Sequence, residues 1–241
     1  MASARGLLLI ADIGGYTDYM STHRMSLAHA EVNTGRLLAT VVDAVPGLEL
    51  IEIEGDAAFL HREVGTSDHD ELVAEVAHSA AAMHRAFHVE REYVATNLCP
   101  CSGCKEAANL TLKFVAHVGE VATQTIRDRL KLVGIDVILV HRLLKNPVPL
   151  REYVLLSEEL YDGGSPALPA DVQQVEPVLE GFGPLRAFYV DVRDLPVGDP
   201  TPLPPPTWRG RLARTAYAAG AGLPYMLGRR GRGRGAVQPV G

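Results

Sequence analysis

Near the start of the chain stands the stretch Leu7-Leu8-Leu9-Ile10-Ala11-Asp12-Ile13-Gly14-Gly15. The run from Leu7 to Ile13 is apolar except for Asp12, which is typical of a short strand buried in a core. The two glycines that follow indicate a turn. The carboxylate of Asp12 is therefore expected close to the end of a buried strand.

Outward from this strand, helical and strand periods are mixed along the chain. Apolar residues at helical spacing predict helices over 26–45, 70–93 and 137–144. Ile51 and Ile53 alternate with Leu50, Glu52 and Glu54, and Gly55 precedes a second apolar stretch, which predicts a hairpin over 48–60. Further strands are expected over 110–118, 153–156 and 188–192. This mixture predicts an α+β sandwich rather than a doubly wound parallel sheet.

Composition narrows the class of protein. The 241 residues are 47% hydrophobic and 22% charged, close to the globular average, which excludes global disorder and fibrous repeats. No apolar run reaches the roughly 18 to 20 residues that a bilayer span needs. The 3 cysteines are clustered, which favours a reducing compartment over a disulfide framework. We therefore expect a cytoplasmic protein.

Charge divides the chain into two parts. All 29 acidic residues precede residue 200, whereas the segment after Trp208 contains seven arginines and no carboxylate side chain. A proline-rich stretch over 199–206 separates the parts and predicts an extended linker. We expect a folded domain over 1–198 with a cysteine loop at 97–108, followed by the linker and a basic tail over 207–241. So acidic a domain is not expected to bind nucleic acid by its own surface.

The tail has several interpretations. Trp208, Leu212, Ala216, Ala219 and Leu223 share one face of a predicted helix flanked by arginines, a pattern that suits an anionic membrane surface. A peripheral position at the inner membrane face would follow. A disordered solubilising tail, an RNA contact through the Arg-Gly run over 229–235, and docking onto the acidic domain remain open alternatives.

Two carboxylates stand beside glycines at predicted strand ends. They are Asp12, before Gly14, and Asp56, after Gly55. If the first strand pairs with the hairpin, both side chains could meet at one sheet edge, where paired carboxylates can hold Mg²⁺ against a triphosphate. A turn-forming or capping role is the alternative for each.

Five segments in order resemble the class III nucleotidyl cyclases, the adenylyl and guanylyl cyclases. They are residues 11–17 (ADIGGYT), 52–57 (EIEGDA), 117–121 (HVGEV), 134–143 (GIDVILVHRL) and 154–159 (VLLSEE). Together they extend over roughly residues 7 to 192. The cysteine loop and the sequence after Arg142 resemble an uncharacterised bacterial branch of such cyclase-like domains. The resemblance implies a ferredoxin-like cyclase-homology sandwich with a mixed or antiparallel sheet and flanking helices.

The resemblance also implies roles for individual residues. Asp12, Ile13 and Asp56 would bind two Mg²⁺ or Mn²⁺ ions, and Arg142 would stabilise charge on the reacting phosphate. Glu52 stands at the base-selecting position and would favour guanine, although it could equally belong to a solvated strand face. Further nucleotide contacts are expected from Gly14, Gly15, Tyr16, Thr17 and Lys131. Because one chain holds one domain, complete sites would require a head-to-tail homodimer.

Four residues depart from the family pattern. Ile138 stands where active members have the asparagine that orients the ribose, and Lys131 occupies the second base-selecting position. Glu180 and Phe182 lie in the segment where a triphosphate-binding lysine is expected. The expected function is cyclisation of a nucleoside triphosphate to a 3′,5′-cyclic nucleotide. A nucleotide-binding sensor or scaffold without turnover, and an interaction module with a vestigial cleft, are the alternatives.

The cysteine loop suggests another metal. Cys99, Cys101 and Cys104 offer three soft ligands, and His88, one turn after His84 on the preceding predicted helix, could supply a fourth. The set predicts a possible structural zinc site. Free thiols or a redox pair are the alternatives.

Overall fold

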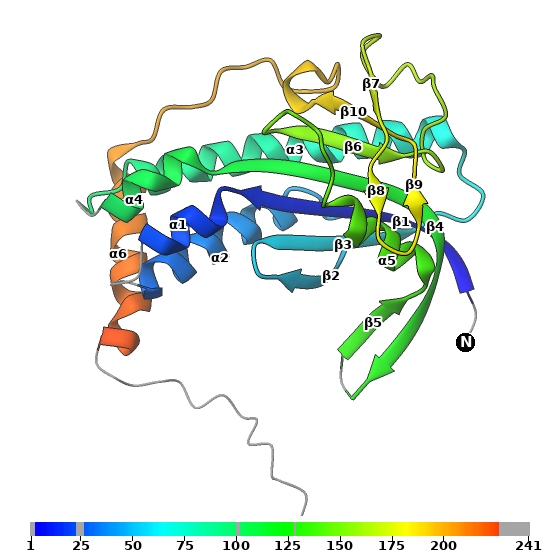
Figure 1. The fold of residues 1–241 in the computed structure, drawn as a ribbon. Coiled ribbons are helices and arrows are strands. Elements are labelled where there is room, and N and C mark those ends of the chain that lie inside the picture. The colour runs from blue at the N-terminus through cyan, green and yellow to red at the C-terminus, as the bar shows by residue number, and fades with distance from the viewer. Residues whose placement is uncertain (1–2, 23–26, 100–101, 128, 227–241) are drawn as a thin grey trace, which may run out of the picture.

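The fold is an eight-stranded sheet with helices on both faces (Figure 1). It is described from a computed structural model, over residues 3–22, 27–99, 102–127 and 129–226. The strands follow the order β2-β3-β1-β4-β6-β10-β7, with β5 paired to the far part of β4. The pairing of β4 with β6 is parallel, and the other pairings described in this sheet are antiparallel.

The strands are β1 (Ser3–Gly14), β2 (Glu49–Glu54), β3 (Ala57–Glu63), β4 (Thr111–Ile126), β5 (Arg129–Val133), β6 (Tyr153–Ser157), β7 (Gln173–Val175), β8 (Val178–Leu179), β9 (Gly183–Pro184) and β10 (Ala187–Asp191). The helices are α1 (Tyr16–Thr22), α2 (Leu27–Asp43), α3 (His69–Ala95), α4 (Ser102–Glu106), α5 (Ile135–Leu143) and α6 (Trp208–Met226). Two 3₁₀ turns, η1 (Ala107–Asn109) and η2 (Val192–Asp194), complete the described elements.

The strand β1 is buried on both faces. Leu7, Leu9 and Ala11 belong to the core under α2 and α3, whereas Leu8 and Ile10 belong to a second core under α5. Successive side chains of a strand point to opposite faces, so this strand needs an apolar residue at nearly every position. Asp12 continues the row of Leu8 and Ile10 and therefore belongs to the α5 face.

The start of α5 is fixed to the sheet by a buried histidine. His117 on β4 is fully buried, with Nδ1 at 2.7 Å from Ser157 Oγ and Nε2 at 3.1 Å from Asp136 Oδ1. The other carboxylate oxygen of Asp136 accepts a bond from the Glu120 backbone N–H at 2.7 Å. Gly119 leaves the room that this carboxylate needs, since a Cβ there would lie 2.3 Å from Asp136 Cγ.

The predicted α+β sandwich with a largely antiparallel sheet is confirmed. The expected strands and helices correspond to described elements, including the β2–β3 hairpin and the long helix α3. The sequence did not predict the short helix α1, the strand β5 or the small pair β8–β9. Strict alternation along 48–54 was wrong, because a bulge between Leu50 and Glu52 breaks the register with β3.

The basic segment after the linker packs on the domain through its arginines. Residues 208–226 form α6, and Arg214 donates to the carboxylate of Glu90, which also accepts from Arg36 on α2. Glu90 is buried, so two guanidinium groups compensate one desolvated charge. The described part of the tail, α6, thus docks onto the acidic domain, which was one of the alternatives. Trp208 and Leu212, which belong to the face expected to contact a membrane, are exposed. The Arg-Gly run over 229–235 lies outside the described residues.

Within the part of the chain that the structure describes, each helix is too short or too polar to cross a bilayer.

Substitution of Gly119 tests the contact that fixes α5. Gly119→Ala is expected to lower the free energy of unfolding by about 1–3 kcal/mol, because the new methyl group must displace the Asp136 carboxylate from its partners. Gly35→Ala is the matched control, since no neighbouring atom lies within 4 Å of a Cβ there and Gly35 is inside α2. The control is expected to gain about 0.5–1 kcal/mol. Urea unfolding measures both, and equal midpoints for the two variants would contradict the contact.

Candidate functional site

Two carboxylates share one edge of the sheet. Asp12 lies near the end of β1, opposite Ala57 in the β1–β3 register, and Asp56 lies in the two-residue turn between β2 and β3. The backbone N–H of Ile13 donates to the Asp56 carbonyl at 3.0 Å, which holds the turn against β1. Gly55, with φ +65°, adopts the left-handed conformation that so tight a turn uses. The pairing that the sequence suggested thus brings the two acidic residues together.

A lysine on the neighbouring strand accompanies this acidic pair. Lys113 of β4 lies opposite Asp12 in the register, with Nζ 3.0 Å from Asp12 Oδ2. Burial, together with the nearby charge of Asp12, raises the pKa of Asp56. Burial disfavours the charged form of Lys113, but the attraction of Asp12 prevails and its pKa is raised. One ammonium group therefore neutralises only part of the charge of two carboxylates.

The glycine turn beyond β1 lies beside the acidic pair. Gly15 has a φ of +81°, and its carbonyl accepts the first bond of α1, from the Tyr19 N–H at 3.0 Å. Burial, together with the charges of Asp56 and Glu31, raises the pKa of the Tyr16 hydroxyl. Thr17 is exposed, and the side chain of Ile13 is buried, so a metal contact from Ile13 would use its backbone carbonyl.

A separate groove of about 300 Å³ lies on the α5 face of the sheet. It is bounded by β2, β5 and α5 and contains Glu52, Lys131 and Arg142 in its wall. Glu52 Oε2 lies 3.6 Å from Lys131 Nζ, so the two residues at the base-selecting positions form an ion pair. The bulge in β2 places Ile51 in the same wall as Glu52 and Glu54.

Two of the departures from the family pattern concern the part of the groove formed by α5. Ile138 is 50% exposed and offers the groove an apolar surface instead of a hydrogen-bonding group. Arg142 donates to the Glu180 carboxylate, in the turn between β8 and β9, and this segment thus supplies an anion where a cation was expected. His141, beside Arg142, has Nδ1 3.5 Å from Glu54 Oε2.

The cysteines and His88 belong to different clusters. Cys99 Sγ lies 3.9 Å from His29 Nδ1, and the ligand atoms of His29, Cys99 and Cys104 lie within 4.8 Å of one another. His88 instead contacts His84 and Glu152. The expectation that His88 completes the cysteine set is therefore wrong for the residues described, and Cys101 lies outside them.

Three residues of these sites were missed by the sequence analysis. His29 precedes Cys99 by 70 positions, and no local spacing connects them. Glu180 was noted only as a departure, although it is the partner of Arg142. Lys113 could have been found from the strand pattern. It faces the same side of β4 as Val115, which belongs to the core under α5, and β4 pairs with β1.

Comparisons with known proteins agree with this fold. A family model described as "Protein of unknown function (DUF2652)" matches residues 34–153. The adenylyl cyclase CyaB from Pseudomonas aeruginosa is 16% identical, with a TM-score of 0.61 over 80% of this chain and 98% of that chain. The guanylate cyclase domain of RhGC from Catenaria anguillulae, solved with GTP, is 15% identical, with a TM-score of 0.58 over 79% of this chain and 98% of its own.

Another similar structure is a class III adenylyl cyclase-like ATP-binding protein from Pseudomonas aeruginosa. It is 17% identical with a TM-score of 0.55, over 69% of this chain and 36% of that chain. These likenesses show a class III cyclase fold. In sequence, the chain is 34% identical to the uncharacterized protein Rv2561/Rv2562 of Mycobacterium tuberculosis, over 84% of this chain and 96% of the relative. The chain therefore belongs to the same protein family as this mycobacterial relative.

Proposed function

We propose that this protein binds a nucleoside triphosphate with divalent cations in a head-to-tail homodimer and cyclises it to a 3′,5′-cyclic nucleotide. The observation that carries the proposal is the acidic pair of Asp12 and Asp56 at one sheet edge, only partly neutralised by Lys113. Release of pyrophosphate balances the reaction, since the ribose 3′-oxygen replaces it on the α-phosphorus. The fold shared with solved cyclase domains supports this reaction class.

The residues present suit Mg²⁺ or Mn²⁺. Carboxylate oxygens are the ligands these ions prefer. Burial, together with the nearby charge of Asp12, raises the pKa of Asp56, and a bound divalent cation would favour the ionised carboxylate. Asp12 and Asp56 would hold the ions. The chemistry that such ions supply is activation of the ribose hydroxyl and neutralisation of triphosphate charge. The exposed turn at Gly15 leaves room for the phosphates beside this pair.

The groove on the α5 face suits the base. Guanine presents two adjacent donors, N1–H and its amino group, to the two oxygens of Glu52, and its O6 can accept from Lys131. Arg142, in the same wall, would stabilise charge on the reacting phosphate. Asp12 and Asp56 are absent from the described lining of this groove, so each complete site would combine the acidic pair of one protomer with the groove of its partner.

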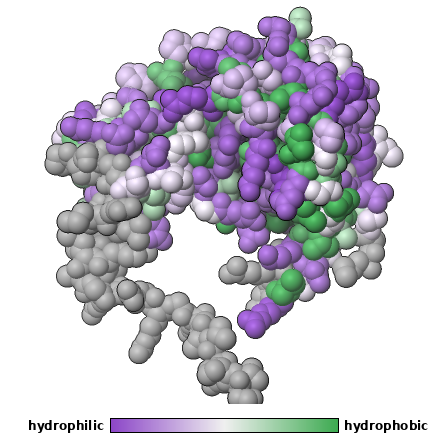
Figure 2. All heavy atoms as spheres, in the orientation of Figure 1, coloured by the Kyte–Doolittle hydropathy of each residue, from purple (hydrophilic) through white to green (hydrophobic). Residues whose placement is uncertain are grey.

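The surface around α5 supports the dimer. Figure 2 shows apolar side chains exposed on the face that carries α5, and the exposed large hydrophobic residues include Ile135, Ile138 and Val178. Contiguous apolar surface of this kind commonly marks an interface.

A nucleotide-binding sensor or scaffold without turnover is the second candidate. Ile138 cannot orient a ribose by hydrogen bonding, and Glu180 occupies the guanidinium of Arg142. The similarity to an ATP-binding cyclase-like protein is in line with this candidate. Incubation with Mn²⁺ and each of the four triphosphates separates the two, because cyclic product supports the enzyme and binding without product supports the sensor.

We also propose a structural zinc ion at the cysteine loop, with His29 in place of His88. Two thiolates and one imidazole suit Zn²⁺, and the cluster would connect the loop to α2. Native mass spectrometry would report this ion. We further propose that the exposed face of α6, which includes Trp208 and Leu212, associates with anionic lipid.

Neutralising the acidic pair tests the metal assignment. Asp56→Asn is expected to weaken Mn²⁺-dependent triphosphate binding at least about tenfold, because one anionic ligand is lost. Asp171→Asn is the matched control, since it removes the same charge from an exposed loop residue. Titration calorimetry with GTP and Mn²⁺ measures both. Equal affinities for the two variants would refute the role of Asp56.

Removing the partner of Arg142 tests the groove. Glu180→Gln should free the guanidinium and tighten GTP binding by up to about fivefold, the factor expected for an exposed ion pair. In an Arg142→Ala background the same change should have no effect, because the pair no longer exists. A fluorescent triphosphate analogue measures the four affinities, and equal effects in both backgrounds would contradict a role for Arg142.

A further inference from the structure

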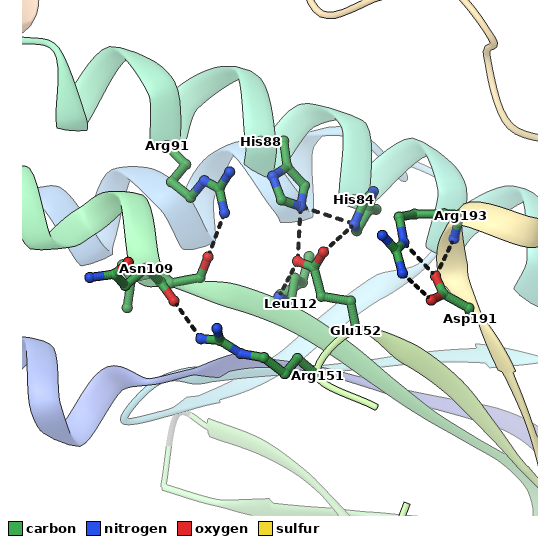
Figure 3. Close-up of polar contacts among 10 residues, drawn as sticks. His84, His88, Arg91, Asn109, Leu112, Arg151, Glu152, Asp191 and Arg193 are labelled. Atoms are coloured by element: carbon green, nitrogen blue, oxygen red, sulfur yellow. Dashed lines mark hydrogen bonds and ion pairs between the residues drawn. The ribbon is translucent and has the colours of Figure 1, made fainter. Parts of the chain in front are cut away.

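A second cluster of potential metal ligands lies on the face of the sheet opposite the groove. His84 and His88, one turn apart on α3, both point toward Glu152, in the segment before β6 (Figure 3). His88 Nε2 is 2.9 Å from Glu152 Oε1, and His84 Nε2 is 3.2 Å from Glu152 Oε2. The two Nε2 atoms are 2.9 Å apart. Three groups from two elements thus converge on one point.

The surrounding structure fixes each of these groups. Spacing of four residues puts both imidazoles on one face of a 27-residue helix. The ring of Phe87 packs edge-on against His88, with centroids 5.4 Å apart. The backbone N–H of Leu112 donates to Glu152 Oε1 at 3.1 Å. The side chains of His84, His88 and Glu152 are only 17%, 11% and 16% exposed, so the cluster is held before any ligand arrives.

With Glu152 ionised, protons alone cannot satisfy all three contacts. If both Nε2 atoms carry a proton for Glu152, two N–H donors meet at 2.9 Å without an acceptor between them. If one Nε2 is unprotonated, it can accept the N–H of the other ring, but its lone pair then lies against a lone pair of the carboxylate. One short contact is therefore repulsive in either arrangement.

A single cation can accept lone pairs from all three side chains. Imidazole nitrogens and carboxylate oxygens bind zinc at about 2.0–2.2 Å. At bond angles between about 90° and 110°, such ligand atoms lie roughly 2.8–3.6 Å apart. The Nε2–Nε2 separation of 2.9 Å falls within this range, as do the separations of 2.9 Å from His88 Nε2 to Glu152 Oε1 and of 3.2 Å from His84 Nε2 to Glu152 Oε2. The carboxylate would therefore present both of its oxygens to the ion. Contacts that are unfavourable between protonated groups therefore suit the ligands of one shared cation.

We propose that His84, His88 and Glu152 bind a divalent transition-metal ion, for which Zn²⁺ is the reference. Two imidazoles and one carboxylate suit zinc and its first-row neighbours better than Mg²⁺ or Ca²⁺, which prefer oxygen ligands. The three ligands line a cavity of about 380 Å³ together with Arg85, Arg193 and Pro202. The remaining coordination positions face this cavity, as in sites that take water or an external ligand. This site is independent of the proposed nucleotide site, because the core under α3 and the core under α5 lie on opposite faces of the sheet.

Metal titration of the full chain tests the site. After chelator treatment, we expect wild-type protein to take up a zinc equivalent that Glu152→Gln and His88→Gln lose, with affinity reduced at least about 100-fold. His78→Gln, an exposed histidine on the same helix, is the matched control and should keep it. In a Cys99→Ser background, which removes the cysteine cluster, added Zn²⁺ should raise the melting temperature of the otherwise unchanged protein and of its His78→Gln form, but not that of its Glu152→Gln form. Each variant is compared with and without Zn²⁺, so a change in the stability of its metal-free form does not mask the result.

The cysteine cluster requires its own arm of the experiment. Co²⁺ bound by thiolates shows sulfur-to-metal charge-transfer absorption, whereas Co²⁺ at His84, His88 and Glu152 lacks it. Cys99→Ser should lose the charge-transfer absorption but keep the Co²⁺ ion bound at His84, His88 and Glu152. The proposal is overturned if Glu152→Gln retains the full stoichiometry and affinity, or if every bound equivalent disappears with Cys99→Ser.

Discussion

The double burial of β1 is the constraint on which the rest of the structure depends. Because β3 and β4 pair with its two edges and separate cores cover its two faces, β1 has almost no position open to water. A charged residue is tolerated only where this enclosure ends. Asp12 lies there, and the same pairing that buries Leu8 and Ile10 aligns it with Lys113 on one side and the Asp56 turn on the other.

What could be predicted from the sequence follows from the range of the interactions involved. Strand and helix periods are local, so the hairpin, α3 and the α+β class were correct, and pairing β1 with the hairpin sufficed to bring Asp12 toward Asp56. Partners set by tertiary packing could not be predicted in this way. Glu152 meets His88 across 64 residues, and Cys99 meets His29 across 70, and no sequence spacing records either approach.

The fold and the groove carry different amounts of functional information. The overall fold is shared with cyclase domains, yet at identities of 15–17% the chemistry depends on individual side chains. In this groove, Glu52 and Lys131 are already paired, and Arg142 is paired with Glu180. The proposed nucleotide would therefore have to break these ion pairs before it makes its own contacts. Exposed ion pairs are weak, so breaking them costs little free energy. An anionic ligand would then replace Glu180 as the partner of Arg142.

A buried carboxylate, Glu90, contributes to holding α6 of the basic tail against the domain. Glu90 faces Arg36 from α2 and Arg214 from α6, and Arg214 also lies over the ring of Tyr93 at 4.0 Å. Loss of Arg214 would leave Glu90 with less compensation for its burial, so the arginine contributes to holding α6 against α3. At least part of the positive charge of this helix is thus used in contacts with the acidic domain. The faces of α6 are divided accordingly, with Arg211 and Arg214 toward the domain and Trp208 and Leu212 toward solvent.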